Sequence, residues 1–179
     1  MKIHLLGPSC SGTSTLGYLI AEKLSIPWYD TDEIFWMKTD PPFTTKRERN
    51  KRIELLTEIF DQNESLVLSG SVLVWGDFIK EYLNLVVYKY VEQELRIKRL
   101  LVREKARYGY RINPGNDMYS LHKEFVEWNK GYETGGMEMR SRKSELEWLK
   151  DIKCKILMLE ENKTPEEELE IVINIINNL

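Results

Sequence analysis

The segment that most constrains the fold is the first 24 residues, where an apolar run, a glycine-rich turn and an amphipathic stretch follow one another. Residues 2–6 (KIHLL) predict a short strand that stops at Gly7. Residues 7–15 (GPSCSGTST) supply small turn-forming side chains, and residues 15–24 repeat apolar positions at helical spacing. A strand, a glycine turn and a helix in this order are the opening of a parallel α/β unit.

The rest of the chain continues this alternation of strands and helices. Apolar runs predict further strands at residues 28–29, 66–68, 85–88 and 156–159. Helical patterns lie at residues 46–62, 92–108, 118–132, 141–150 and 165–177. We therefore expect an α/β three-layer sandwich with a parallel sheet of about five strands, rather than an all-β fold, and a single domain over residues 1–179.

One helical pattern carries an unusually large apolar stripe. Its members are Met118, Leu121, Phe125, Trp128 and Tyr132. Spacings of three and four residues put these side chains on one face of a helix. We expect this face to pack against the core rather than to line a cofactor site.

Composition excludes several classes of protein. The 179 residues include 26 lysines and arginines and 29 aspartates and glutamates, which give a formal charge of −3. This balance provides no overall attraction to nucleic acid or to an anionic membrane. No apolar run approaches the roughly 18 residues of a membrane span, and the N-terminal apolar stretch is too short for a secretory signal. Two cysteines, Cys10 and Cys154, are too few for a disulfide framework. We expect a cytoplasmic protein that binds neither nucleic acid nor membrane.

The motif with the clearest chemistry is residues 7–15, which follow the pattern G-x-x-x-x-G-K-[ST] except at one position. In that pattern backbone N–H groups wrap a phosphate, and glycines stand where a Cβ would block the approach. Ser14 occupies the position whose hydroxyl ligates Mg²⁺, whereas Thr13 stands where the pattern has lysine. The predicted phosphate-binding residues are Gly7, Ser9, Cys10, Ser11, Gly12, Thr13, Ser14 and Thr15. The alternative is an ordinary glycine turn followed by a helix cap.

This loop, together with WYDTD at residues 28–32, resembles the small P-loop kinases: shikimate kinase, gluconate kinase and the adenylate kinase-like group. More narrowly, the GTST end of the loop and TDPPF at residues 39–43 resemble adenylate kinase-like ATP-binding proteins. The resemblance implies a P-loop NTPase fold of the nucleoside monophosphate kinase type, with a small helical lid at about residues 103–136. It also implies ATP and Mg²⁺ as cofactors, a small-molecule acceptor, and an adenine contact at residues 160–164.

Two aspartates follow the second expected strand at a spacing of two, which puts both side chains on one face. Asp30 and Asp32 suit the water shell of Mg²⁺ or the proton of an acceptor hydroxyl. A solvated turn or a helix N-cap is the alternative. By resemblance to shikimate kinase, Asp30 faces the metal together with Ser14, and Asp32 is a catalytic and substrate-binding residue that faces the acceptor.

The strand predicted at residues 66–68 ends in small residues, Ser69, Gly70 and Ser71. Ligands of parallel α/β sheets bind beyond the carboxyl ends of the strands, so small side chains there leave room for a substrate. This strand end carries no acidic residue for a metal, which is why we expect Asp30 to serve that role.

Arginines recur on one face of the helix expected at residues 92–108: Arg96, Arg99, Arg103 and Arg107. Stacked like charges repel one another unless an anion meets them, although Glu94 and Glu104 make a solvated face a serious alternative. The kinase resemblance implies that arginines of this helix and of the lid bind the transferring phosphates. The candidates are Arg103 and Arg107 for catalysis, Arg111 and Arg142 for the substrate, and Arg140 as a further possibility.

The missing loop lysine leaves the activity open. Another basic residue replaces it (Lys38, Lys46 or a lid arginine), or transfer is slow, or the site only binds nucleotide. Our leading hypothesis is an ATP-dependent small-molecule kinase, monomeric or homodimeric, that acts on a nucleotide or another metabolite. A nucleotide-binding module with little or no phosphotransfer is the second hypothesis. A transferase with another donor, such as a sulfonucleotide, is the third.

Overall fold

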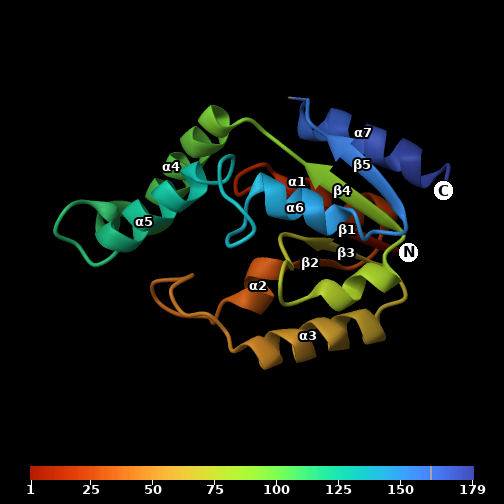
Figure 1. Ribbon diagram of the computed structural model, residues 1–179, viewed down its shortest axis with the longest axis horizontal. Coiled ribbons are helices and arrows are strands. Elements are labelled where there is room, and N and C mark those ends of the chain that lie inside the picture. The colour runs from red at the N-terminus through yellow and green to blue at the C-terminus, as the bar shows by residue number, and fades with distance from the viewer. Residues whose placement is uncertain (162) are drawn as a thin grey trace.

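A central sheet of five parallel strands organises the computed structural model, which describes residues 1–161 and 163–179. The strand order is β2–β3–β1–β4–β5 (Figure 1). The bounds are β1 (Lys2–Leu6), β2 (Trp28–Asp30), β3 (Leu66–Ser69), β4 (Leu85–Lys89) and β5 (Lys155–Leu159). The parallel sheet expected from the sequence is confirmed, and each strand lies where its apolar run predicts.

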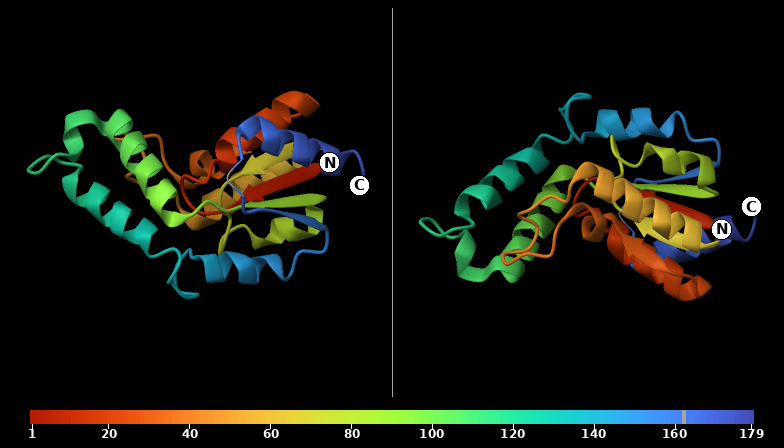
Figure 2. Two further views of the ribbon diagram at one scale, coloured as in Figure 1. Left: turned by 90° about the horizontal axis from the view of Figure 1, so that it is seen from above. Right: turned by 90° about the horizontal axis from the view of Figure 1, so that it is seen from below.

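One face of the sheet is covered by α1 (Thr13–Leu24) and α7 (Pro165–Ile176), as Figure 2 shows. Side chains alternate across a strand, so Ile3 and Leu5 of β1 point to this face. They are buried with Leu16 of α1 and Val172 of α7. The stripe of apolar residues in each helix is thus used against the sheet.

The opposite face is covered by α3 (Arg49–Gln62), the short 3₁₀ helix η1 (Asp77–Tyr82) and α6 (Arg142–Leu149). Leu66 and Leu68 of β3 point to it and pack in one cluster with Phe60 and Trp148. Most residues of β1, β3 and β4 are apolar because both faces of these strands are buried. The three-layer sandwich is therefore confirmed.

Three short elements were not expected: α2 (Thr31–Phe35), η1 and η2 (Gly109–Ile112). They contain five, six and four residues. Elements of this length complete too few turns to show a repeating apolar pattern, which explains why the sequence does not reveal them.

A helical hairpin projects from the sheet and gives the molecule its long axis (Figures 1 and 2). It consists of α4 (Gln93–Tyr108), η2 and α5 (Tyr119–Lys130). The buried guanidinium of Arg96 ties its base to Glu133 at 2.7 Å. In the part of the chain that the structure describes, no helix has both the length and the apolar character needed to cross a membrane.

The apolar stripe of α5 does not face the core as expected. Met118 and Tyr132 at its ends are buried, but Leu121 and Trp128 are 49% and 39% exposed. The reason is that α5 lies on the hairpin, beyond the carboxyl ends of the strands, where it packs against α4 and η2 (Figure 2). The middle of the stripe instead lines the large cleft that separates the hairpin from the sheet.

Candidate active site at the carboxyl ends of the strands

A cleft of about 1720 Å³ opens between the carboxyl ends of the strands and the helical hairpin. Sites for a single drug-sized ligand measure about 300–1,000 Å³. The cleft therefore has room for two substrates at once. Its walls come from the glycine-rich loop, from α2 and the segment after it, and from the inner faces of α4 and α5.

The glycine-rich loop occupies the floor of this cleft, between β1 and α1. Gly7 and Gly12 have positive φ angles of 153° and 97°. A Cβ on Gly7 would overlap the backbone carbonyl of Lys89, and a Cβ on Gly12 would lie 3.1 Å from the Cε of the same residue. Gly7 is therefore required by the close approach of the loop to the end of β4, and Gly12 by its positive φ.

The predicted loop residues are brought together as expected. Pro8 and every following residue of the loop through Thr15 line the cleft, while Gly7 lies beneath them. The hydroxyl of Ser11 is buried and has no hydrogen-bond partner among the described residues. Because buried polar groups are normally paired, this hydroxyl is suited to a bound ligand. The loop continues directly into α1, whose N-terminus favours an anion.

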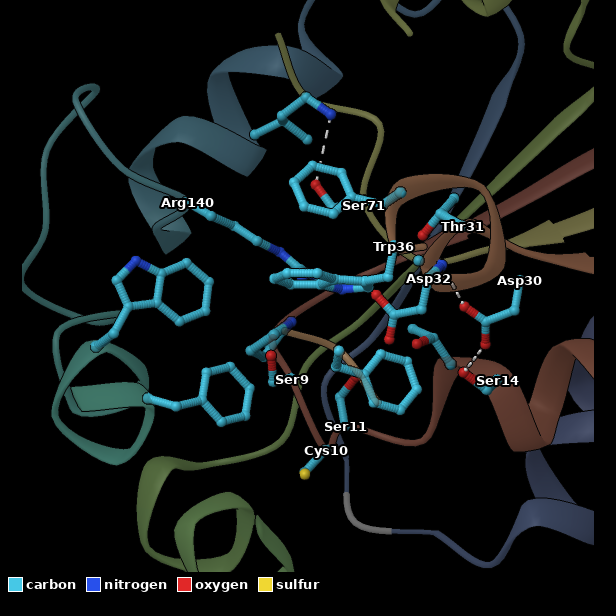
Figure 3. Close-up of a pocket in the computed structure, with 18 of the residues that line it drawn as sticks. Ser9, Cys10, Ser11, Ser14, Asp30, Thr31, Asp32, Trp36, Ser71 and Arg140 are labelled. Atoms are coloured by element: carbon cyan, nitrogen blue, oxygen red, sulfur yellow. Dashed lines mark hydrogen bonds between the residues drawn. The ribbon is translucent and has the colours of Figure 1, made fainter. Parts of the chain in front are cut away.

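The two residues expected at the metal are in direct contact. Ser14 Oγ donates to Asp30 Oδ2 at 2.6 Å (Figure 3). The other oxygen of Asp30 accepts from the backbone N–H of Asp32 at 2.9 Å and caps α2. The metal and N-cap interpretations thus apply to the same carboxylate. A hydroxyl and a carboxylate are the oxygen ligands that Mg²⁺ accepts alongside water and phosphate, so this donor set fits Mg²⁺.

Asp32 points into the cleft, away from the Ser14–Asp30 pair (Figure 3). Asp32 is solvent-exposed, but partial desolvation by the surrounding cleft walls raises the pKa of its carboxyl, and the neighbouring Asp30 carboxylate raises it further. The charges of Arg140, Arg103 and Arg107 act in the opposite direction. The charges of the three guanidinium groups therefore act on the protonation of the Asp32 carboxyl across the cleft.

Three of the four arginines predicted on one face of α4 reach the cleft: Arg99, Arg103 and Arg107. Arg103 Nε is buried with no hydrogen-bond partner among the described residues. The guanidinium of Arg107 lies 4.1 Å from the ring centre of Phe43, in a cation–π contact. In the same row, Arg96 is 1% exposed and serves the base of the hairpin instead.

Arg111 and Arg142 are not brought to the cleft, contrary to expectation. Arg111 forms ion pairs with Asp40 at 2.9 Å and with Asp117 in the η2–α5 loop. Arg142 begins α6 and pairs with Glu160 at 2.9 Å. Each guanidinium is held by carboxylates outside the residues that line the cleft. Local partners, which the sequence does not specify, decide the direction of these side chains.

The small residues after β3 divide between structure and site. Gly70 and Ser71 line the cleft, as expected. Ser69 is fully buried and does not line it. Its hydroxyl accepts from the Trp28 indole at 3.0 Å and donates to the Thr13 carbonyl at 3.2 Å. Ser69 therefore fixes the loop and α1 against the sheet rather than contacting a substrate.

Two basic residues flank the loop in addition to those assigned from the sequence. Arg140, only a further candidate there, donates to the carbonyl of Gly7 and to Glu145 at 2.8 Å. Lys89 was missed, and it forms a buried ion pair with Glu168 of α7. The available signal was a charged residue at the end of the otherwise apolar run LVVYK.

An aromatic wall, which we define as Trp36, Phe43, Phe125 and Trp128, forms the other missed part of the site. Phe125 and Trp128 of α5 are stacked, with ring centres 6.0 Å apart and planes 14° from parallel. Trp36 and Phe43, from the segment after α2, meet edge to face. Flat apolar surfaces of this kind suit a planar ligand group.

The segment expected to contact adenine is partly described. Lys163 lines the cleft, as does Pro165 at the start of α7. Asn162, also in the predicted segment, lies outside the described residues. The adenine contact therefore stays a prediction.

Comparison of the sequence with those of known proteins identifies the family of the chain. No family model matches it. It is 38% identical to the uncharacterized protein YqaC of Bacillus subtilis (strain 168) over 177 residues, which is 99% of this chain and 98% of YqaC. The chain belongs to the YqaC family.

Further similarities connect this YqaC-family chain with kinases. A cytidylate kinase of Archaeoglobus fulgidus is 29% identical over 115 residues, 58% of this chain and 62% of that kinase. A shikimate kinase of Acinetobacter baumannii, solved in complex with shikimate, superposes with a TM-score of 0.59 at 17% sequence identity. The superposition covers 99% of this chain and 93% of the shikimate kinase chain. The fold is thus that of shikimate kinase, and the resemblance to the small P-loop kinases is confirmed.

Proposed function

We propose that this YqaC-family chain is an ATP-dependent phosphotransferase that moves the γ-phosphoryl group of Mg-ATP to a small acceptor. The observation that carries the proposal is the Ser14–Asp30 contact, which lies at the end of a glycine loop and beside Asp32. A phosphate cradle, an oxygen-ligand pair and a carboxylate in the same cleft are the parts that phosphoryl transfer needs.

Nucleotide binding is assigned to the loop at residues 7–15. Its backbone N–H groups and the N-terminus of α1 would hold the β- and γ-phosphates. Ser14 and Asp30 would hold Mg²⁺, which when bound neutralises charge on the phosphate oxygens. The buried hydroxyl of Ser11 would donate to a phosphate and so gain the partner it lacks among the described residues.

Phosphoryl transfer is assigned to Asp32 and the arginines around it. The acceptor oxygen would form a bond to the γ-phosphorus as the bond from this phosphorus to the β–γ bridging oxygen breaks, which releases ADP. For a hydroxyl acceptor, the proton would pass to the Asp32 carboxylate. Its raised pKa makes it a better proton acceptor than an ordinary aspartate. Arg103, Arg107 and Arg140 would stabilise the charge on the transferring group.

The aromatic wall indicates the kind of acceptor. Its four rings offer stacking surfaces that a polyol does not need but a flat ring uses. We therefore favour an acceptor that carries such a ring, as nucleosides and nucleotides do. The helical hairpin would act as the expected lid, since it carries half of this wall together with Arg103 and Arg107.

Thr13 supports a second candidate function. The residue stands where the phosphate-loop pattern has its lysine, and loss of that cation weakens stabilisation of the transition state. A module that binds ATP without transferring its phosphate would retain the same loop and cleft.

Calorimetric titration of ATP, with and without Mg²⁺, tests nucleotide binding. We expect micromolar affinity that Gly12→Val abolishes, because its side chain would crowd Lys89 and fill the loop. Gly115→Val is the matched control: Gly115 also has a positive φ, but a Cβ there meets nothing within 4 Å. No binding by the unaltered protein would contradict the proposal.

Release of ADP then separates the two candidates. Nucleosides, nucleoside monophosphates and ring-free polyols are offered as acceptors to the ATP-bound protein. Turnover that depends on an acceptor supports the phosphotransferase, and Asp32→Asn should reduce it. ATP binding without turnover for any acceptor would support the binding module instead.

A further inference from the structure

Lys89 is an unusual residue for the end of a central strand. The four preceding residues of β4 are completely buried and apolar or aromatic, and Lys89 itself is only 6% exposed. A buried ammonium group is tolerated when it is paired. Its partner in the described chain is Glu168 of α7, which is 2% exposed.

Lys89 also lies in contact with the glycine-rich loop. Gly7 approaches its backbone carbonyl, and Gly12 approaches its Cε, the carbon that carries the ammonium group. The side chain also lines the cleft together with the loop. A positive charge therefore lies near Gly12, which precedes Thr13, the residue that replaces the loop lysine.

We propose that Lys89 supplies the cation that the loop lacks and binds the β- and γ-phosphates of the nucleotide. The inference rests on the proposed function, because it assumes that the loop holds a nucleotide. Lysine suits this role as a compact charge with three donors on a flexible stem. A short movement of the ammonium group away from Glu168 would bring it to an anion held by the loop amides.

Three of the other candidate cations are placed less favourably. Lys38 does not line the cleft. Lys46 lines it from the segment before α3, where its backbone pairs with that of Trp36. Arg140 is beside the loop, but its guanidinium is already engaged by the Gly7 carbonyl and by Glu145.

The test must remove the lysine without leaving a buried carboxylate unpaired, because such a charge is strongly destabilising. The double variant Lys89→Met/Glu168→Gln replaces both charges by neutral side chains of similar size. Calorimetric titrations compare its affinity for Mg-ATP and for AMP with those of the unaltered protein. The matched control is Lys153→Met/Glu81→Gln, which removes an exposed ion pair and likewise leaves the net charge unchanged.

We expect the double variant to lose about tenfold or more in ATP affinity while its AMP affinity changes little, since AMP lacks the phosphates that Lys89 contacts. Adding Thr13→Lys to the double variant should restore ATP binding, because it returns a cation to the same phosphates. Rescue from a different element is a result that a purely structural role of Lys89 would not give.

Three results would overturn the inference. An unchanged ATP affinity in the double variant would mean that Lys89 does not contact the nucleotide, although the proposed function would stand. Equal losses for ATP and AMP, with no rescue by Thr13→Lys, would assign Lys89 to structure alone. Failure of the unaltered protein to bind ATP would instead overturn the proposed function and this inference with it.

Discussion

Asp32 is the residue at which the cleft acts most directly on the chemistry of a side chain. Partial desolvation by the cleft walls and the charge of Asp30 both raise the pKa of its carboxyl. An acid with a raised pKa in the folded state binds protons more tightly there than in the unfolded chain. Ionised Asp32 therefore opposes folding, and the stability it contributes when protonated is lost as pH rises through its folded-state pKa.

We predict that Asp32→Asn raises the free energy of unfolding at pH 7, where the carboxyl of the unaltered protein is ionised. The advantage should shrink as the pH is lowered from 7 to about 4, because protonation removes the charge that the cleft disfavours. Turnover should fall about 100-fold or more if Asp32 accepts the proton of the acceptor. Urea unfolding at both pH values and steady-state kinetics measure these effects.

Asp117→Asn provides a control of opposite sign. The hydrogen bond from Arg111 lowers the pKa of the Asp117 carboxyl, so this group stabilises the fold when ionised. The substitution should destabilise the protein at pH 7, and the difference should disappear as the pH falls through the pKa of Asp117. A stability change of the same sign in both variants would contradict the interpretation of Asp32.

Part of the site follows from sequence alone, and part depends on tertiary contacts. The proximity of Ser14 and Asp30 was predictable, because the phosphate-loop pattern and the kinase resemblance assign both residues to one metal. Arg111 and Arg142 were misplaced because nearby carboxylates, rather than spacing, orient their side chains. Lys89 was missed because the significance of a charge at a strand end appears only when β4 lies beside the loop.

At the scale of elements, α5 shows the limit of periodicity as a guide. The spacing correctly predicts a helix with one apolar face, but it does not say what that face contacts. The strands and longer helices were predictable because their patterns report local backbone geometry. The orientation of α5 depends on the way α4 carries it beyond the sheet, which the sequence pattern does not encode.

Two tryptophans allow this difference to be measured. Trp148 of α6 is 6% exposed in the core, whereas Trp128 of α5 is 39% exposed beside the cleft. We predict that Trp148→Ala lowers the free energy of unfolding by about 3–5 kcal/mol, the usual loss for a buried large aromatic side chain. Trp128→Ala should lower it by less than about 1 kcal/mol and instead weaken acceptor binding.

Urea unfolding followed by circular dichroism compares the two variants without depending on tryptophan fluorescence. Acceptor affinity is measured on the ATP-bound protein. Comparable losses of stability would show that the stripe of α5 belongs to the core after all.

At the scale of the whole molecule, one side of the cleft belongs to the sheet and the other to the helical hairpin. Asp30 and the loop are fixed to the sheet, whereas Arg103, Arg107 and half of the aromatic wall are carried by the projecting hairpin. Substrates that touch both sides favour an arrangement in which the hairpin lies closer to the sheet.

Hydrogen exchange tests this closure. With ATP and an acceptor bound, we predict slower exchange along α5, Tyr119–Lys130, because its cleft face becomes covered and its motion restricted. Exchange in α3, Arg49–Gln62, on the opposite part of the molecule, serves as the internal control. Protection confined to the loop at residues 7–15 would show that ligands bind without moving the hairpin.

The pairing of Lys89 with Glu168 also has a consequence for synthesis. The chain leaves the ribosome N-terminus first, so the glycine loop and β4 emerge well before α7. Until α7 docks, Lys89 lacks the buried carboxylate of Glu168 that balances its charge, and its burial beside Gly12 is unfavourable. The floor of the cleft is therefore completed by the last helix of the fold, and unfinished chains lack it.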